Sequence, residues 1–340
     1  NYGMHEIVPE GDRLEDAEPP AASIPPSPGH EHEWINCIKT RKQPSCSADY
    51  HCRIDVALNL ANLSMRRGRA IPLDPDNQRI LDKVFTAGAD AVVIDLEDAV
   101  SPACKSEARE ILRRNLEPLD PAATPPVWVR INPVGSGLWR DDLAAVVGPW
   151  LSGVRIPKAQ DPDAIEKVVE FLSLREAAAG MPPGSISLTL TIESAVGVER
   201  CGELARCARV TNLCFGNVDF LADIGARDGE DGIAALYAHS RVVLASRVAG
   251  IGPPIAPVLT RLDDEALLRS TTERFRNLGF FGRSCIHPQQ LPAIHDVFTP
   301  AADEVAEARA IVAAYESGLD NASGSEVTAG GQFVDIAVVK

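Results

Sequence analysis

Charged side chains follow a series of short apolar runs, at the points where buried strands would end. They are three acids after the first run, and then an arginine, a lysine and two further acids: Asp95, Glu97, Asp98, Arg130, Lys158, Glu193 and Asp219. Carboxylates that converge beside an arginine and a lysine form an oxygen-rich site, and hard oxygen donors suit Mg²⁺ or Mn²⁺ better than a soft metal. His287 is the only histidine near such a strand end, which disfavours zinc. The pattern therefore predicts a divalent-cation site.

The elements that would position these residues alternate along the chain. Seven apolar, β-branched runs predict strands at 91–97, 126–132, 153–158, 187–194, 211–218, 255–260 and 279–286. Helical patterns lie between them, so the fold class is α/β with a parallel sheet covered by helices. The number of units favours a (β/α)8 TIM-type barrel, in which active sites lie at the carboxyl ends of the strands. No G-x-G-x-x-G follows the first run, which argues against a dinucleotide-binding sheet.

Composition narrows the classes of partner. The 340 residues include 33 Lys and Arg against 48 Asp and Glu, a formal net charge of -15. A nucleic-acid surface needs a basic face, which this balance disfavours. No apolar run approaches the roughly 18 residues of a membrane span. The 8 cysteines include no C-x-x-C pair, which is typical of reduced thiols. We expect a cytoplasmic protein that acts on neither nucleic acid nor membrane.

Seven motifs between residues 76 and 340 together resemble a known family. In chain order they read ADAVVIDLEDAVSPACKSEAR, VWVRINP, IPKAQDPDAI, LTIESAVGV, FGNVDFLADIG, SRVVLASRVAGI and SCIHPQQL. The series is similar to the citrate lyase beta-subunit-like group of the HpcH/HpaI aldolase superfamily, which also contains malyl-CoA and citramalyl-CoA lyases. The resemblance implies a carbon–carbon lyase that depends on Mg²⁺, with Mn²⁺ as an alternative cation.

The reaction that the resemblance implies is a retro-Claisen or retro-aldol cleavage. Its substrate is a 3-hydroxy-carboxyacyl thioester such as malyl-, citramalyl- or citryl-CoA, carried by CoA or by acyl-carrier protein, and its products are a 2-oxo acid and an acyl thioester. The resemblance also implies a homotrimer or hexamer. Two alternatives stay open: a class II aldolase acting on 4-hydroxy-2-oxo acids, and an inactive fusion product whose barrel is only structural.

The resemblance gives individual residues their roles. Glu193 and Asp219 resemble the two metal ligands, and Arg130 resembles the arginine that clamps a substrate carboxylate. Asp335 resembles an acid/base aspartate that can reach a neighbouring subunit's active site. Lys158 and His287 are expected to bind substrate.

Four further residues are expected around the metal and the arginine: Asp95, Glu97, Asp98 and Lys105. For some of these residues a purely structural role stays open as the alternative. Asp95, Glu97 and Lys105 could form purely structural ion pairs, and His287 could cap or pack at a helix start.

The chain before the barrel has a different character. Residues 1–75 predict an extension with a disordered, proline-rich and acidic start, followed by helices between 34 and 67 that include an apolar helical stripe over 54–65. Residues 27–79 resemble the C-terminal tail of Gfo/Idh/MocA-type oxidoreductases, without their nucleotide-binding domain.

The barrel is expected at 76–298, and a C-terminal helix and lid segment at 299–340. The family's first strand is atypical or missing here, because RRGRAIPL stands at its place in residues 66–73. Residues 70–74 could be recruited as a makeshift first strand, or the barrel could stay open.

Overall fold

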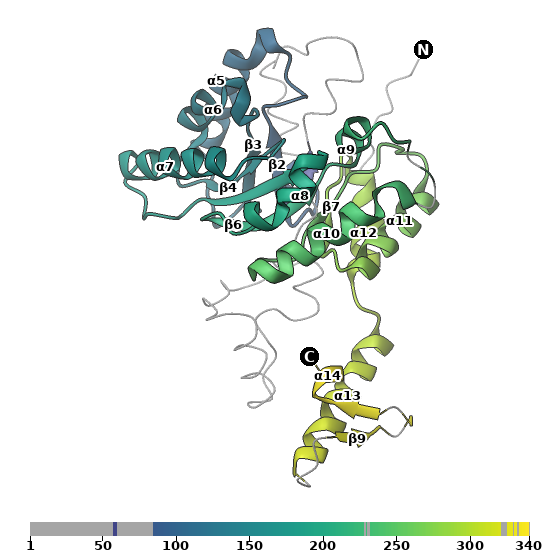
Figure 1. Cartoon of the computed structure of the whole chain (residues 1–340). Coiled ribbons are helices and arrows are strands. Elements are labelled where there is room, and N and C mark those ends of the chain that lie inside the picture. The colour runs from purple at the N-terminus through teal and green to yellow at the C-terminus, as the bar shows by residue number, and fades with distance from the viewer. Residues whose placement is uncertain are drawn as a thin grey trace, which may run out of the picture. The chain divides into compact units, whose positions relative to one another are not determined.

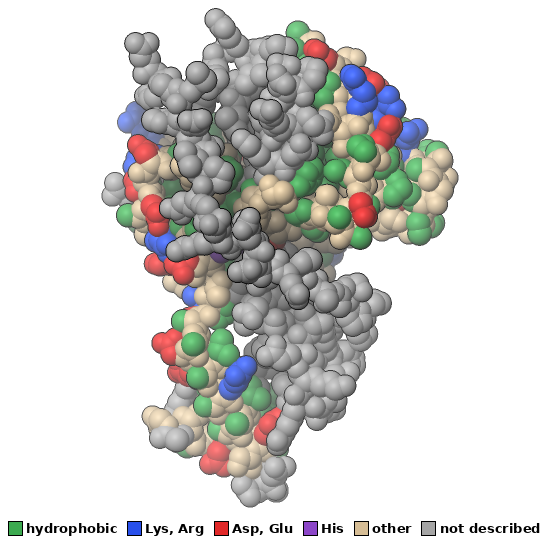
Figure 2. Space-filling model, turned by 180° about the vertical axis from the view of Figure 1, so that it is seen from behind, with side chains coloured by type: hydrophobic (Ala, Val, Ile, Leu, Met, Phe, Trp, Pro, Cys, Tyr) green, Lys and Arg blue, Asp and Glu red, His purple; other side chains and the backbone are tan. Residues whose placement is uncertain are grey.

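The computed structural model describes residues 57–59, 84–227, 229, 232–320, 325–328, 330–331 and 333–339. The segment that resembles an oxidoreductase tail, and the start that was expected to be disordered, lie outside these residues, apart from the short strand at 57–59. The helices that the structure describes include none with the length and hydrophobicity of a membrane span. Acidic and basic side chains lie next to one another on the described surface (Figure 2). Arg113 and Glu110, for example, form an ion pair of 3.0 Å.

One parallel sheet organises the chain, and each of its strands pairs with the next strand in sequence (Figure 1). Its strands are β1 (Ala57–Asn59), β2 (Ala91–Asp95), β3 (Val127–Arg130), β4 (Leu151–Ile156), β5 (Ser187–Ile192), β6 (Val210–Phe215), β7 (Ile255–Ala256) and β8 (Gly282–Arg283). The seven strands expected between 91 and 286 are all confirmed. Among the described residues no ladder joins β8 to β1, so the structure shows a curled, open sheet and closure into a (β/α)8 barrel stays a prediction.

The first strand differs from expectation. Ala57–Asn59 pairs in parallel with Ala91–Val93 of β2, although the apolar stripe over 54–65 predicted a helix there. The helix prediction is therefore wrong for these three residues. A short apolar segment is ambiguous between helix and strand, and the unpaired edge of β2 decides in favour of the strand. The proposed substitute at 70–74 lies outside the described residues.

Helices follow the strands as expected. They are α5 (Lys105–Leu116), α6 (Trp139–Val146), α7 (Pro162–Ala178), α8 (Ala195–Leu204), α9 (Asn217–Asp223), α10 (Ile233–Ala249), α11 (Glu265–Leu278) and α12 (Leu291–Phe298), with short 3-10 turns at Pro102–Cys104, Val134–Ser136 and Pro288–Gln290. Side-chain caps fix several starts: Asp264 accepts a hydrogen bond from the Leu267 N–H at 2.9 Å, and Ser194 accepts one from the Gly197 N–H at 3.1 Å. The second cap fixes the start of α8 directly after Glu193.

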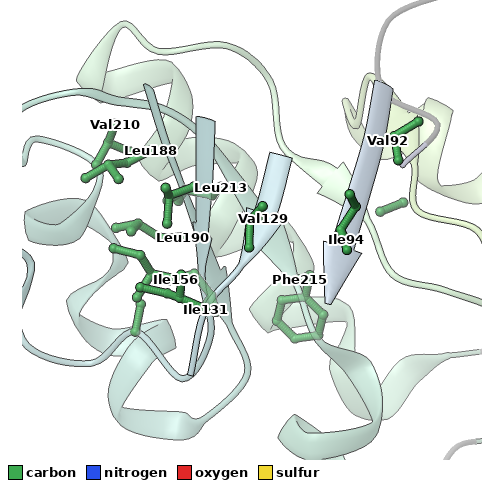
Figure 3. Close-up of a cluster of buried hydrophobic side chains, with 14 of the residues drawn as sticks. Val92, Ile94, Val129, Ile131, Ile156, Leu188, Leu190, Val210, Leu213 and Phe215 are labelled. Carbon is green, nitrogen blue, oxygen red and sulfur yellow. The ribbon is translucent and has the colours of Figure 1, made fainter. Parts of the chain in front are cut away.

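Residues on the outer face of the strands form the main core with these helices. Figure 3 shows part of it, including Val129, Ile156 and Leu190, and the same cluster contains Val168 of α7. The intervening residues of each strand point to the opposite, inner face of the sheet. There the Trp128 ring lies over Gly153, where a Cβ would stand 2.2 Å from the ring. The inner face therefore carries both aromatic packing and, nearer the carboxyl ends, the charged residues.

The C-terminal segment contains α13 (Ala302–Asp320), an antiparallel hairpin of β9 (Ser325–Val327) and β10 (Phe333–Asp335), and α14 (Ile336–Val339). Near the start of α13, Glu304 forms an ion pair of 2.8 Å with Arg276 of α11. A helix was expected within 299–340, and α13 lies in that range. The lid role expected for 299–340 stays a prediction.

Candidate active site

The carboxyl ends of β2 and β3 are joined by a two-point ion pair. Arg130 donates from Nε to Asp95 Oδ1 at 2.7 Å and from Nη2 to Asp95 Oδ2 at 2.5 Å. Both residues sit opposite each other in the strand register, so the pairing follows directly from the parallel ladder. Asp95 also accepts the backbone N–H of Glu97 at 2.8 Å, which fixes the turn after β2. The guanidinium is thus held in one orientation.

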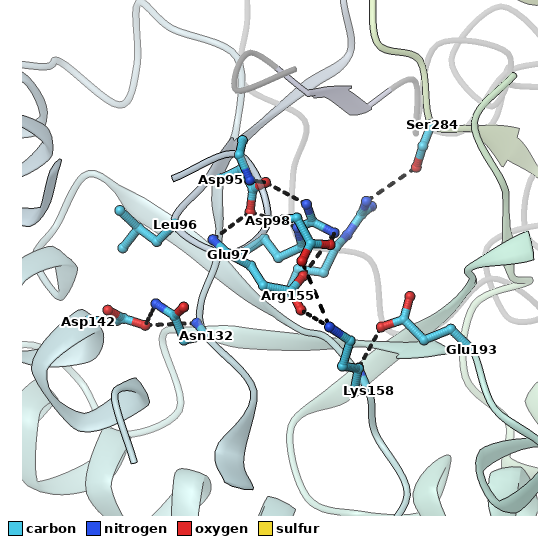
Figure 4. Close-up of polar contacts among 12 residues, drawn as sticks. Asp95, Leu96, Glu97, Asp98, Asn132, Asp142, Arg155, Lys158, Glu193 and Ser284 are labelled. Atoms are coloured by element: carbon cyan, nitrogen blue, oxygen red, sulfur yellow. Dashed lines mark hydrogen bonds and ion pairs between the residues drawn. The ribbon is translucent and has the colours of Figure 1, made fainter. Parts of the chain in front are cut away.

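Glu97 bridges this arginine to a lysine (Figure 4). Its Oε2 lies 3.0 Å from Arg130 Nη1, and its Oε1 accepts a hydrogen bond of 2.9 Å from Lys158 Nζ. Burial raises the pKa of Glu97, although Arg130 opposes this shift. Asp98 is the exposed member of the group, 3.8 Å from each of the two cations. The four residues form one continuous charge network.

Lys158 contributes through its backbone as well. It adopts φ = 51°, the left-handed region that non-glycine residues seldom occupy. In this conformation its N–H donates a hydrogen bond of 2.7 Å to Glu193 Oε1, at the end of β5. Backbone strain of this kind persists where the surroundings hold it in place, often at functional sites. Lys158 therefore fixes Glu97 with its side chain and Glu193 with its main chain.

Glu193 is a buried carboxylate, 5% exposed, and it sits against Gly216 at the end of β6. A Cβ at Gly216 would lie 2.3 Å from Glu193 Oε2, so only glycine fits beside this side chain. Burial raises the pKa of Glu193 to about 7, with further increases from the charges of Glu97 and Asp219. Asp219 is exposed in the first turn of α9 and accepts no hydrogen bond from any residue that the structure describes.

These carboxylates fit a hard divalent cation. The charges of Glu97 and Asp219 add to the effect of burial in raising the pKa of Glu193, and a cation beside these acids would relieve that repulsion. Within the described part of the chain no group of three or more His, Cys, Asp or Glu side chains forms a full ligand set. Mg²⁺ commonly takes one or two protein carboxylates and completes its shell with water and substrate, so a pair such as Glu193 and Asp219 would be enough.

Replacing Gly216 by alanine is expected to displace the Glu193 carboxylate and to abolish stabilisation by Mg²⁺. The backbone at Gly216 has φ = -106°, which alanine adopts freely, so the effect comes from the close contacts with Glu193, 2.3 Å to Oε2 and 2.6 Å to Cβ. We expect a loss of about 1–3 kcal/mol in the free energy of unfolding from overpacking. Thermal melts with and without Mg²⁺ measure both effects. Gly135→Ala is the matched control, because a Cβ there meets nothing within 4 Å. Full Mg²⁺ stabilisation of the Gly216 variant would contradict this geometry.

Three other expected site residues have different surroundings. Lys105 donates hydrogen bonds of 2.6 Å to the backbone carbonyls of Leu96 and Glu97, so it does not form the ion pair with Asp95 or Glu97 that was one of the two alternatives. Burial lowers the pKa of the Lys105 ammonium, and carbonyl acceptors satisfy it without a carboxylate contact. Lys105 thus holds the turn that carries Glu97.

His287 and Asp335 both act as caps. His287 Nδ1 accepts a hydrogen bond of 3.2 Å from the Gln289 N–H at the start of a 3-10 turn. This agrees with the alternative in which His287 caps a helix start. Asp335 Oδ1 accepts the N–H groups of Ala337 and Val338 at 2.9 and 3.2 Å. Among the described residues no hydrogen bond or ion pair links Asp335 to Arg130 or Glu193.

The sequence reasoning missed the residues that support the site. Asp142, fully buried in α6, accepts hydrogen bonds from the backbone N–H and the side-chain amide of Asn132, and it pairs with Arg109 at 2.7 Å. This fixes the loop that follows Arg130. An acid in the first turn of a helix is a weak signal, because exposed acids are common there. The close fit of Gly216 against Glu193 also has no signature in sequence.

A curled parallel sheet with carboxylates and an arginine at the carboxyl edge is the arrangement of a barrel-type α/β enzyme. Comparison with known proteins gives the family. The model of the family described as HpcH/HpaI aldolase/citrate lyase matches residues 73–288, so the chain belongs to this family.

The relatives include several lyases. Citrate lyase subunit beta of Leuconostoc mesenteroides is 32% identical over 74% of this chain and 83% of its own length. L-malyl-CoA/beta-methylmalyl-CoA lyase of Cereibacter sphaeroides is 33% identical over 77% of this chain and 87% of its own. The solved structure of CitE from Mycobacterium tuberculosis with magnesium, acetoacetate and coenzyme A has a TM-score of 0.62 and 28% identity, covering 78% of this chain and 91% of that one.

Proposed function

We propose that this chain is an Mg²⁺-dependent carbon–carbon lyase that cleaves a 3-hydroxy-carboxyacyl thioester, carried by CoA or acyl-carrier protein, into a 2-oxo acid and an acyl thioester. The observation that carries the proposal is the buried Glu193 carboxylate, held by the Lys158 N–H and coupled to Asp219. Relatives named as citrate lyase beta subunit and malyl-CoA lyase support the reaction class.

Glu193 and Asp219 would hold the cation, with Mn²⁺ as an alternative. Bound Mg²⁺ supplies Lewis acidity at the carbonyl oxygen of the 2-oxo acid. Arg130, oriented by Asp95, binds a substrate carboxylate with its remaining donors. Lys158, whose side chain is 41% exposed, places a positive charge at the mouth of the site. We also assign substrate binding to His287, in the loop after β8.

The proposed cleavage needs no oxidant or reductant. A base removes the proton of the 3-hydroxyl, the Cα–Cβ bond breaks, and the oxygen becomes the carbonyl of the 2-oxo acid. The electron pair moves onto the thioester as an enolate, which is protonated at carbon. We assign this protonation to Asp335, supplied within a homotrimer or hexamer, and we place the enzyme in the cytoplasm.

A substrate panel tests the proposal. The full chain with Mg²⁺ is incubated with malyl-, citramalyl- and citryl-CoA, and the released 2-oxo acid is measured as a hydrazone. We expect release from at least one thioester, stopped by a chelator and reduced at least ~100-fold by Asp219→Asn, because the metal would lose a charged ligand.

Glu170→Gln, on the exposed face of α7, is the matched control and should leave the rate unchanged. Release from 4-hydroxy-2-oxo acids alone would favour the class II aldolase instead. Folded, Mg²⁺-binding protein that cleaves none of these compounds would contradict the proposal and favour an inactive barrel.

A further inference from the structure

A second arginine points into the interior of the curled sheet beside the proposed site. Arg155 lies in β4 between Val154 and Ile156, which both belong to the outer core. Side chains alternate along a strand, so Arg155 faces the inner side. Its register partners are Arg130 on β3 and Thr189 on β5, which places it in the same layer as the arginine of the proposed site.

The charge of Arg155 has no acidic partner. The residue is 6% exposed, and in the described part of the chain no carboxylate lies within 4.0 Å of it. Its Nη1 donates one hydrogen bond of 3.2 Å to Ser284 Oγ, at the end of β8 (Figure 4), and its buried Nε has no partner. Arg130 and Arg209, in contrast, are held by the buried acids Asp95 and Glu176.

A buried guanidinium without a counterion is costly, because it loses hydration and gains no attraction in return. Arg283 of β8 is also a deeply buried arginine, and it avoids part of this cost by donating to the Pro257 carbonyl and to the hydroxyls of Thr271 and Thr272. Arg155 has only the one hydroxyl. An anion bound beside it would supply the missing charge and the missing acceptors.

A second unpartnered donor lies near the same place. Thr191 follows Thr189 by two positions on β5, so it shares the inner face and stands one step closer to the carboxyl edge. Its hydroxyl oxygen is buried and has no hydrogen-bond partner. The inner face thus presents a guanidinium and two hydroxyls, from Arg155, Thr191 and Ser284, and all three residues are less than 9% exposed.

We propose that Arg155, with Thr191 and Ser284, forms a subsite for a second carboxylate of the substrate. Arg130 and the cation would hold one carboxylate, and Arg155 takes another beside it, over β4 and β5 of the inner face. The preferred substrate is therefore a thioester whose 2-oxo acid half carries two carboxylates. This inference rests on the proposed function, since it assigns the substrate class of that same site.

Equilibrium binding tests the subsite without requiring cleavage. The Mg²⁺-loaded full chain is titrated in a calorimeter with oxaloacetate, a 2-oxo acid with two carboxylates, and with pyruvate, which has one. We expect oxaloacetate to bind at least ~10-fold more tightly, as one added charge-assisted pair provides. In Arg155→Met the affinity for oxaloacetate should fall to that for pyruvate, while the affinity for pyruvate stays unchanged.

The stability of the variant separates a binding role from a structural one. Methionine fills much of the same space without a charge, so Arg155→Met should melt at the same temperature as the parent or higher. Arg114→Met, on an exposed helix face, is the control and should change neither the preference for oxaloacetate nor the melting temperature.

An oxaloacetate preference that survives in Arg155→Met overturns the subsite, as does equal affinity of the parent for both acids. A retained, Arg155-dependent preference in a protein that cleaves no thioester would refute the lyase alone and leave the subsite standing.

Discussion

Glu193→Gln is expected to abolish Mg²⁺ binding, to lower the lyase rate by on the order of 10³-fold, and to make the metal-free protein more stable at pH 8. The first two effects follow from the loss of a charged ligand. The third follows from burial, because the Glu193 carboxylate is 5% exposed and its pKa is raised to about 7 by burial and by the charge of Glu97. Glutamine keeps the acceptor for the Lys158 N–H but carries no charge.

The sign of the pH effect can be worked out from the raised pKa. The ordinary pKa of this group is 4.5, so between pH 4.5 and about 7 the folded protein holds a proton on Glu193 that the unfolded chain has released. Stability therefore falls as pH rises through this window, and the full loss, on the order of 3 kcal/mol, is present above pH 7. Protons also compete with the cation, so Mg²⁺ affinity should weaken as pH drops below about 7.

Denaturant unfolding of the metal-free protein and of the Glu193→Gln variant at pH 5 and pH 8 measures this difference. The two should be similar at pH 5 and should separate at pH 8, with the variant the more stable. Added Mg²⁺ should then raise the stability of the parent alone. A variant that is less stable than the parent at both pH values would show that the Glu193 carboxylate stabilises the fold and is not an uncompensated charge in the absence of a cation.

Arg130→Met is expected to cost about 3–5 kcal/mol of stability at neutral pH. It would leave Asp95 and Glu97, 4% and 3% exposed, buried without the guanidinium that both contact. Lys158 would still pair with Glu97, so Asp95 bears most of the loss. Urea unfolding provides the measurement, and the loss should shrink at low pH as the carboxylates take up protons.

The double variant Arg130→Met with Asp95→Asn is the decisive comparison. Removing the second charge should recover part of the stability, because the uncompensated carboxylate is gone. Catalytic activity should not recover, since the proposed carboxylate clamp is still absent. Stability of Arg130→Met within about 1 kcal/mol of the parent would mean that the pair is replaced by solvent and is not the centre of the network.

The sequence predicted the strands that carry the site because each is a continuous β-branched run, as at 187–192, and because buried parallel strands tolerate little else. It also predicted which residues stand at their carboxyl ends. The first strand at Ala57–Asn59 could not be recognised, since a three-residue pairing depends on a neighbour more than 30 positions away.

The network among the site residues was only partly visible in the sequence. Strand register pairs Asp95 with Arg130, but whether Lys105 reaches a carboxylate or a carbonyl depends on the turn between them. Likewise, the left-handed conformation of Lys158 and the contact between Gly216 and Glu193 are products of tertiary packing. Local patterns specify elements and their ends, whereas packing specifies which donor meets which acceptor.

The uneven pairing of the sheet has a consequence for how the molecule opens. β2 to β6 are joined by ladders of four or five residue pairs, whereas β7 and β8 pair through only one or two. Local unfolding should therefore begin in the β7–β8 half, while the half that bears Asp95, Arg130 and Glu193 keeps its backbone hydrogen bonds. The hydrogen bond from Arg155 to Ser284 connects the two halves. An anion bound at Arg155 would strengthen this connection, so that occupancy of the site would also stabilise the β7–β8 half against local unfolding.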